Sequence, residues 1–263
     1  MLKKLLKYEL RFSLRHLAIF YSIGVFFALL TRLFLRIENS IVMDVISKIC
    51  SGVTISMIFN ILINNVLAFW GRFKKNLYGD ESYLTHTLPV NKHTMYLSKA
   101  LSALITLFAS MAVITLLLFV AYYTKENMQA LKNLLFGIAT SLDSNITGFV
   151  FALLFIFFLQ TANVLQIGFT GTILGHRMQT NKTLFSIAFG FVIYMASQTI
   201  ILVLLFLVSL FNADLINLFI TNGEFTTNAI KILVILSLIA YMGMLFGVYF
   251  LNVKLFKQGV NVD

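Results

Sequence analysis

Six long apolar stretches divide this chain and restrict what it can fold into. They cover residues 17–35, 49–70, 96–123, 146–174, 184–211 and 229–251. A helix that crosses the hydrocarbon core of a bilayer needs about 20 mostly apolar residues. Soluble domains have about 25% charged residues, whereas this chain is 11% charged and 59% hydrophobic. Backbone polar groups in lipid must be satisfied within their own segment, so we expect an all-α integral membrane protein with six transmembrane helices.

The N-terminal segment 1–16 has a basic face. Lys3, Lys7, Arg11 and Arg15 recur every four residues, and leucines occupy the opposite side. This spacing predicts an amphipathic helix that lies at the membrane interface. The same segment also fits a simple positive anchor that sets the orientation of the first span.

Positive charge is divided unevenly between the two sides of the predicted membrane. Of the 20 Lys and Arg residues, 14 lie on the side that holds both termini and the connection 71–95. Cytoplasmic loops are enriched in Lys and Arg, so we expect both termini and this connection in the cytoplasm. The lysine-rich, proline-poor composition is typical of a bacterial protein, so we expect it in the bacterial cell membrane. Because the excess charge sorts by loop, it indicates topology and contact with the lipid bilayer, not nucleic acid. The chain is expected to form one transmembrane domain, 1–263.

Two other connections have patterns of their own. Within 124–145, apolar residues keep helical spacing, which predicts an amphipathic helix on the membrane surface. The connection 212–228 has an apolar interior, which predicts a segment that dips back into the interface.

The connection 71–95 is the most polar part of the chain and contains the only proline. Gly79 is expected to end the second long helix, and Asp80 and Glu81 suit the start of a new helix, where the dipole favours negative charge. Pro89 is expected to end that helix, because the residue before a proline is pushed out of the helical region. Asn91 is placed to cap the third span. The short helix has a partly apolar face of Tyr83, Leu84, Thr87 and Leu88, which needs a cover, either the membrane or a partner protein.

The chain lacks the motifs of several catalytic and transport classes. It has no GxxxxGK[ST] phosphate loop, no HExxH and no Cys or His cluster with metal-ligand spacing. No predicted span has a charged residue at its centre, which disfavours a proton-driven carrier. We therefore expect no catalytic residue and no metal site on this chain.

Amide side chains inside the predicted spans have two interpretations. They include Asn60 and Asn64 on one face of the second span, and Gln160, Asn163 and Gln166 on roughly one face of the fourth. They fit hydrogen bonds between helices. They also fit a weakly polar lining of a translocation path, and the sequence does not separate the two.

Two glycine pairs at a spacing of four residues indicate close helix contacts. Gly171 and Gly175 end the fourth span, and Gly243 and Gly247 lie in the sixth. Small residues at this spacing allow two membrane helices to approach closely. We therefore expect both pairs at helix packing surfaces.

The stretch RFKKNLYGDESYLTHTLPVNKHTMYLSKALSAL, residues 72–104, resembles a known family. The likeness is carried by Gly79-Asp80-Glu81, by Thr87-Leu88-Pro89-Val90 and by Ser98-Lys99. These features are similar to the segment after the second span in small bacterial ABC-2 type permeases. The basic N-terminal helix and the six spans extend the resemblance to the whole chain at the level of architecture.

The resemblance implies an ABC-2 permease fold of the type V exporter kind and a role as a non-enzymatic transporter subunit. Two permease chains, identical or related, would pair, each with a cytoplasmic ABC ATPase that holds ATP and Mg²⁺. No cofactor is then expected on this chain. The short helix would be the coupling helix, with the ATPase-coupling residues Asp80, Glu81, Tyr83, Leu84, Thr87, Leu88 and Pro89. By the same analogy, the substrate would be an antimicrobial or other amphipathic peptide, exported in self-protection or resistance.

Two other functions stay open at this point. A membrane enzyme or a stand-alone carrier would work without a partner, although the spans offer no group of acidic and basic side chains for either. An accessory or sensor protein would dock a cytoplasmic partner through the same short helix and transport nothing. ATP-dependent flux of substrate would separate the exporter from the sensor.

Overall fold

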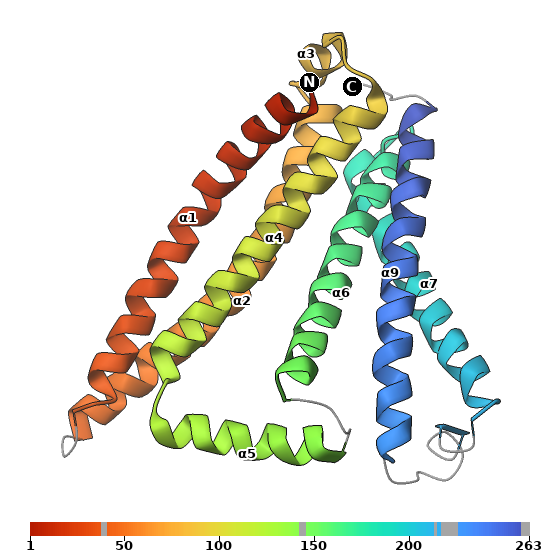
Figure 1. The fold of residues 1–263 in the computed structure, drawn as a ribbon. Helices are drawn as coiled ribbons and strands as arrows, with labels where there is room; N and C mark the ends of the chain where they lie inside the picture. Colours follow the sequence, from red (N-terminus) through yellow and green to blue (C-terminus); the bar gives the residue numbers. More distant parts are fainter. Residues whose placement is uncertain (38–40, 142–145, 213–214, 217–225, 259–263) are drawn as a thin grey trace. The chain divides into compact units, whose positions relative to one another are not determined.

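A computed structural model describes residues 1–263 except 38–40, 142–145, 213–214, 217–225 and 259–263. Every element of this described part is an α-helix (Figure 1). The all-helical class predicted from the hydropathy pattern is therefore confirmed. The chain has the architecture of a multi-pass membrane protein.

Six of the helices are long and apolar enough to cross a membrane, as predicted. They are α1 (Leu2–Phe34), α2 (Ile41–Leu77), α4 (Lys92–Tyr122), α6 (Ile146–Gly175), α7 (Lys182–Ser209) and α9 (Thr227–Lys257). At 1.5 Å per residue, helices of this length exceed the roughly 30 Å hydrocarbon core of a bilayer. Several turns of α1 and α2 must therefore lie outside the hydrocarbon layer.

The interfacial helix predicted over 1–16 is not a separate element. It continues without a break into the first span as α1, a single helix of 33 residues. The physical reason is local, since no glycine or proline interrupts the chain before Gly24. The basic segment is thus an extension of the span, and not a helix that turns away from it.

The helix predicted in the connection 124–145 is present as α5 (Lys125–Ser141). Most of the connection 212–228, expected to dip into the interface, lies outside the described residues.

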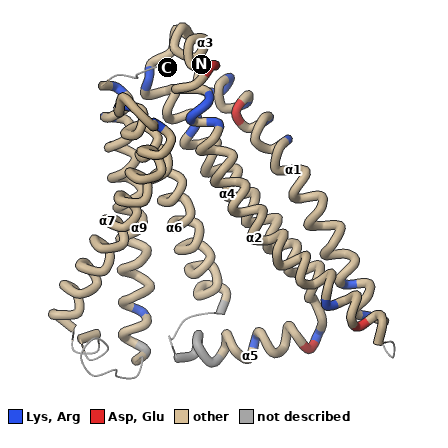
Figure 2. Tube along the Cα trace, turned by 180° about the vertical axis from the view of Figure 1, so that it is seen from behind, with Lys and Arg blue, Asp and Glu red and all other residues tan. Residues whose placement is uncertain are grey.

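The described chain divides into two compact units. The first unit contains residues 1–76 and 80–129, and its core joins α1, α2 and α4 through Ala28, Ile61, Leu117 and Ala121. A chain of hydrogen bonds also crosses these helices, because Asn65 Nδ2 donates to Ser110 Oγ at 2.7 Å and Ser110 shares a hydrogen bond with the Tyr21 hydroxyl at 2.7 Å. In this unit most Lys and Arg residues lie toward the ends of the helices (Figure 2).

The second unit contains residues 77–79 and 130–263, with α6 packed against α7 and α9. Gly171 and Gly175 lie where α6 meets α7, and a Cβ on Gly171 would come within 2.6 Å of the Ser186 carbonyl oxygen. A Cβ on Gly175 would also collide with Ser186.

The glycines of α9 behave differently from those of α6. A Cβ on Gly243 or Gly247 would meet nothing within 4 Å in the described chain. The close contact expected at this second pair is therefore absent within the described chain, because the face of α9 that carries it is not turned toward α6 or α7.

Candidate functional site: the α3 turn and its ion triad

The polar connection folds into a short helix between two long ones. α2 ends at Leu77, and α3 (Ser82–Thr87) follows the turn at Gly79. Leu88 then adopts an extended conformation before Pro89, as steric contact with the proline ring requires. The Asn91 side chain accepts a hydrogen bond from the His93 backbone N–H at 3.0 Å and caps α4. The helix and the cap that the sequence predicted are both present.

Apolar side chains on α3 and on the residue after it are exposed. Tyr83 is 64% exposed, Leu84 is 76% exposed and Leu88 is 44% exposed. Asp80, Thr87 and Pro89 are exposed beside them. Six of the seven residues expected to couple to an ATPase therefore lie on one exposed connection. The seventh, Glu81, is half-buried and faces α2.

Contacts to α2 hold the start of α3. The Lys75 ammonium lies 3.0 Å from Glu81 Oε1. The Glu81 carbonyl accepts hydrogen bonds from the Thr85 backbone N–H at 3.1 Å and from the Thr85 hydroxyl at 2.9 Å. A six-residue helix is too short to be stable alone. The local hydrogen bonds at Glu81 and the ion pair to α2 therefore help to maintain it.

A buried triad of charged residues ties together the three helices beside α3. Glu9 of α1 accepts a hydrogen bond from Lys99 Nζ of α4 at 3.0 Å and another from Arg72 Nε of α2 at 2.5 Å. Lys99 is only 5% exposed and Glu9 is also buried. The Arg72 guanidinium additionally lies 3.8 Å from the centre of the Phe12 ring, in cation–π contact.

The charges of the triad do not balance. Two cations share one carboxylate, so the cluster has a net positive charge. Removing charges from water is costly unless they are paired, and the ion pairs offset that cost. The triad therefore fixes the relative positions of α1, α2 and α4 at the end of the unit where α3 is attached.

Sequence reasoning missed Glu9. It is the only acidic residue in the first 37 residues. Glu9, Ser13 and Leu17 are spaced by four and are all buried in α1. An acid aligned with the buried stripe of a helix is the signal that could have identified it, because a buried carboxylate requires a cationic partner.

Tyr78 and His176 form a second buried contact, within the second unit. Their rings lie 4.4 Å apart, and both side chains are buried. The His176 ring also contacts the Thr172 carbonyl oxygen at 2.8 Å. Burial raises the pKa of the Tyr78 hydroxyl, and the positive charge of Arg177 lowers it by less. Tyr78 is therefore neutral at physiological pH and acts in packing.

The amides predicted to line a path make hydrogen bonds within each unit. Asn60 and Asn64 belong to the first unit and donate to backbone carbonyls of their own helix at 2.9 Å. Gln166 is buried and accepts hydrogen bonds from Asn252 of α9. For these residues the structure shows local or interhelical hydrogen bonds.

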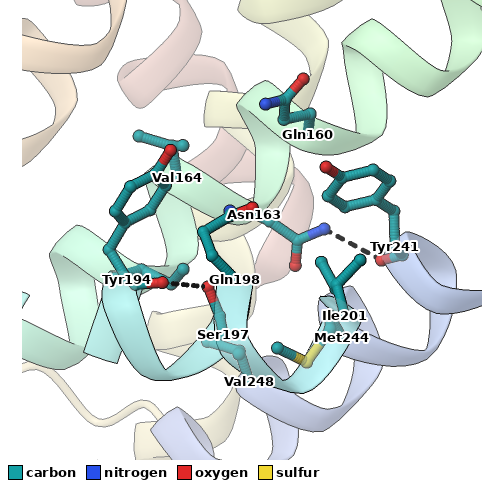
Figure 3. A pocket seen from close by; sticks show the side chains of 11 residues that line it. Gln160, Asn163, Val164, Tyr194, Ser197, Gln198, Ile201, Tyr241, Met244 and Val248 are labelled. Carbon is teal, nitrogen blue, oxygen red and sulfur yellow. Dashed lines mark hydrogen bonds between the residues drawn. The ribbon is translucent and has the colours of Figure 1, made fainter. Parts of the chain in front are cut away.

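Gln160 and Asn163 lie together at a small cavity between α6, α7 and α9 (Figure 3). Asn163 Nδ2 donates to the Tyr241 carbonyl oxygen at 2.9 Å. The cavity volume is about 10 Å³, which is room for roughly one water molecule. In this conformation the cavity does not admit a solute.

The described residues contain no group of three or more His, Cys, Asp or Glu side chains that could hold a metal ion. The chain was also compared with known proteins. Searches of protein-family models, of curated proteins and of solved structures each found no match to this chain.

Proposed function

We propose that this chain is the membrane-spanning permease subunit of an ATP-binding cassette exporter. The observation that carries the proposal is α3, a short helix with exposed Tyr83 and Leu84 that is followed by exposed Leu88 and joined to the ends of two long apolar helices. Exposed apolar side chains that cluster on a charged end of a membrane protein mark an interaction site. The resemblance of residues 72–104 to ABC-2 permeases supports α3 as the coupling helix.

The partner in this proposal is a separate cytoplasmic ABC ATPase. The sequence contains no phosphate-binding loop, so ATP and Mg²⁺ would bind to the partner. A second permease chain, identical or related, would complete the translocation path. The excess of Lys and Arg on the side of the chain that holds α3 and both termini supports a cytoplasmic location for them. The family resemblance suggests the bacterial cell membrane.

The ion triad supports a mechanism for the coupling. Glu9, Arg72 and Lys99 connect α1, α2 and α4 at the end where α3 is attached. A displacement of α3 by the ATPase would therefore act on three helices as a group. Such movement at the interface between two permease chains would open or close a path for an amphipathic peptide, the substrate class that the family resemblance suggests.

A copurification experiment tests the class of function. The protein would be extracted gently from its native membrane, and the bound proteins would be identified by mass spectrometry. We expect a stoichiometric cytoplasmic ATPase. A chain that purifies alone and transports solute in proteoliposomes would instead be a carrier, and one that binds the ATPase but supports no ATP-dependent flux would be an accessory or sensor protein.

The double substitution Leu84→Asp and Leu88→Asp tests the role of α3. We expect the protein to insert normally and its affinity for the ATPase to fall by roughly thirtyfold or more, since central apolar anchors of an interface contribute about 2 kcal/mol or more. Copurified ATPase per permease is the measurement.

Two control variants accompany this change. Leu84→Met with Leu88→Met keeps the apolar surface and should retain the ATPase. Leu131→Asp with Leu134→Asp alters exposed leucines of α5 and should also retain it. Full ATPase binding by the Leu84→Asp, Leu88→Asp variant would show that α3 is not the coupling helix.

A further inference from the structure

A groove between α1 and α2 lies beside the ion triad in the first unit. Its volume is about 240 Å³. Polar and charged side chains line one part of it, namely Arg72, Lys75, His16, Asn76 and the carboxylate Glu81, and Leu67, Ala68 and Phe12 contribute apolar surface. The groove therefore joins a basic part to an apolar part.

The basic part of the groove favours an anion. Arg72 and Lys99 share the single carboxylate of Glu9, and of these two cations Arg72 lines the groove. Lys75 and Glu81 of the groove offset each other, so one positive charge of the triad is left over beside it. Nε is the only side-chain nitrogen of Arg72 with a hydrogen bond to a described residue, and a guanidinium has five donor hydrogens. Its two terminal nitrogens can therefore bind an oxyanion in the bidentate manner typical of Arg.

The surroundings of the groove strengthen this preference. The segment 1–16 contains five Lys and Arg residues and one acid, Glu9. Lys75 of the groove is paired with Glu81, and because the Lys75 side chain is 65% exposed and the Glu81 side chain is 44% exposed, this ion pair is weak. An anion in the groove can therefore interact with Lys75 as well as with Arg72.

The apolar part of the groove indicates what carries the anion. Leu67 and Ala68 precede Arg72 by about one turn of α2, toward the uncharged stretch of that helix. Leu67 is half exposed. A free phosphate gains nothing from this apolar surface, whereas a phospholipid has a phosphate and acyl chains in the same order along the helix. The volume is below the roughly 300–1,000 Å³ of pockets that enclose drug-sized ligands, so acyl chains would remain in the bilayer.

We propose that this groove is a binding site for an anionic phospholipid, with the lipid phosphate at Arg72 and Lys75 and the start of an acyl chain along Leu67 and Ala68. Basic pockets between membrane helices on the cytoplasmic side suit such head groups. The two sites share Arg72 and Glu81, but lipid binding does not require an ATPase, because it needs only the groove and its charges.

Gly71 offers a way to block the groove without disturbing the fold. It lines the groove, and a Cβ at this position would meet nothing within 4 Å. Gly71→Leu should therefore fill the groove with a side chain. Gly52→Leu is the matched control, since Gly52 also lies in α2 with open space around it but does not line the groove.

The experiment uses the purified full chain in detergent with added phosphatidylglycerol, phosphatidylcholine or inorganic phosphate. Bound lipid is counted by native mass spectrometry, and thermal unfolding is measured in parallel. We expect a preference for phosphatidylglycerol of roughly five- to twenty-five-fold, because each basic residue near an anionic lipid contributes about a factor of five. Phosphatidylglycerol should also raise the unfolding temperature, and inorganic phosphate should not.

The variants decide the location of the site. Gly71→Leu should lose the preference, Lys75→Gln should weaken it several-fold, and Gly52→Leu should retain it. Equal retention of the two lipids by the wild-type chain would overturn the proposal. So would an unchanged preference in Gly71→Leu. An equal stabilisation by inorganic phosphate would show a simple anion site and would exclude the lipid.

Discussion

Glu9→Gln is expected to destabilise the first unit severely. The substitution keeps the shape of the side chain but leaves the buried Lys99 and the partly buried Arg72 without a carboxylate. Breaking a buried ion pair by removing one partner costs about 3–5 kcal/mol, because the remaining charge is uncompensated. We therefore expect a large drop in the midpoint of thermal or denaturant unfolding in detergent.

Two further variants make this result specific to the triad. Glu126→Gln removes an exposed acid on α5 and should leave the unfolding midpoint unchanged. Adding Lys99→Met to Glu9→Gln removes the most deeply buried cation and should recover part of the lost stability. If Glu9→Gln unfolds at the wild-type midpoint, the triad does not hold α1, α2 and α4 together.

Substitution of glycine by alanine is expected to have opposite effects in α6 and α9. At Gly171, the added methyl group would lie 2.6 Å from the Ser186 carbonyl oxygen and 2.8 Å from Gly190 Cα. Both are backbone atoms, so α6 and α7 must separate. Overpacking of this kind costs about 1–3 kcal/mol. At Gly243 the methyl group meets nothing, and Ala is about 0.8–1.0 kcal/mol more favourable than Gly in a helix.

The unfolding midpoints of the two alanine variants, measured side by side, check this prediction. Gly171→Ala should be lower than wild type, and Gly243→Ala should be equal or higher. Gly175→Ala should resemble Gly171→Ala, since its added atom also meets Ser186, and Gly247→Ala should resemble Gly243→Ala. A similar loss in both helices would mean that the contact of α6 with α7 is not what makes glycine necessary.

The candidate site contains features that local sequence patterns predict and others that they do not. The turn at Gly79, the stop at Pro89 and the cap at Asn91 are properties of a few neighbouring residues, and the structure contains all three features. The exposure of Leu84 also agrees with the amphipathic pattern of α3. The ion triad of Glu9, Arg72 and Lys99 could not be predicted in the same way, because its residues are distant along the chain.

The amides and glycines also separate what neighbouring residues predict from what helix packing decides. Asn60 and Gln160 have similar neighbours in sequence, yet Asn60 is exposed and Gln160 lies at a cavity between three helices. The two glycine pairs share one motif, yet only the pair in α6 meets another helix within the described chain. Which face of a helix meets a neighbour depends on helix rotation and crossing, and a short motif does not contain that information.

The sequence by itself determined the membrane class, the six long helices and the short helix between α2 and α4. Hydropathy, helix breakers and caps act over one or a few turns, so a local pattern is sufficient for them. Only the tertiary structure decided that Glu9 meets Arg72 and Lys99, which are 63 and 90 residues away in the chain. A buried carboxylate takes its partners from whichever helices pack around it, and that packing is a property of the whole fold.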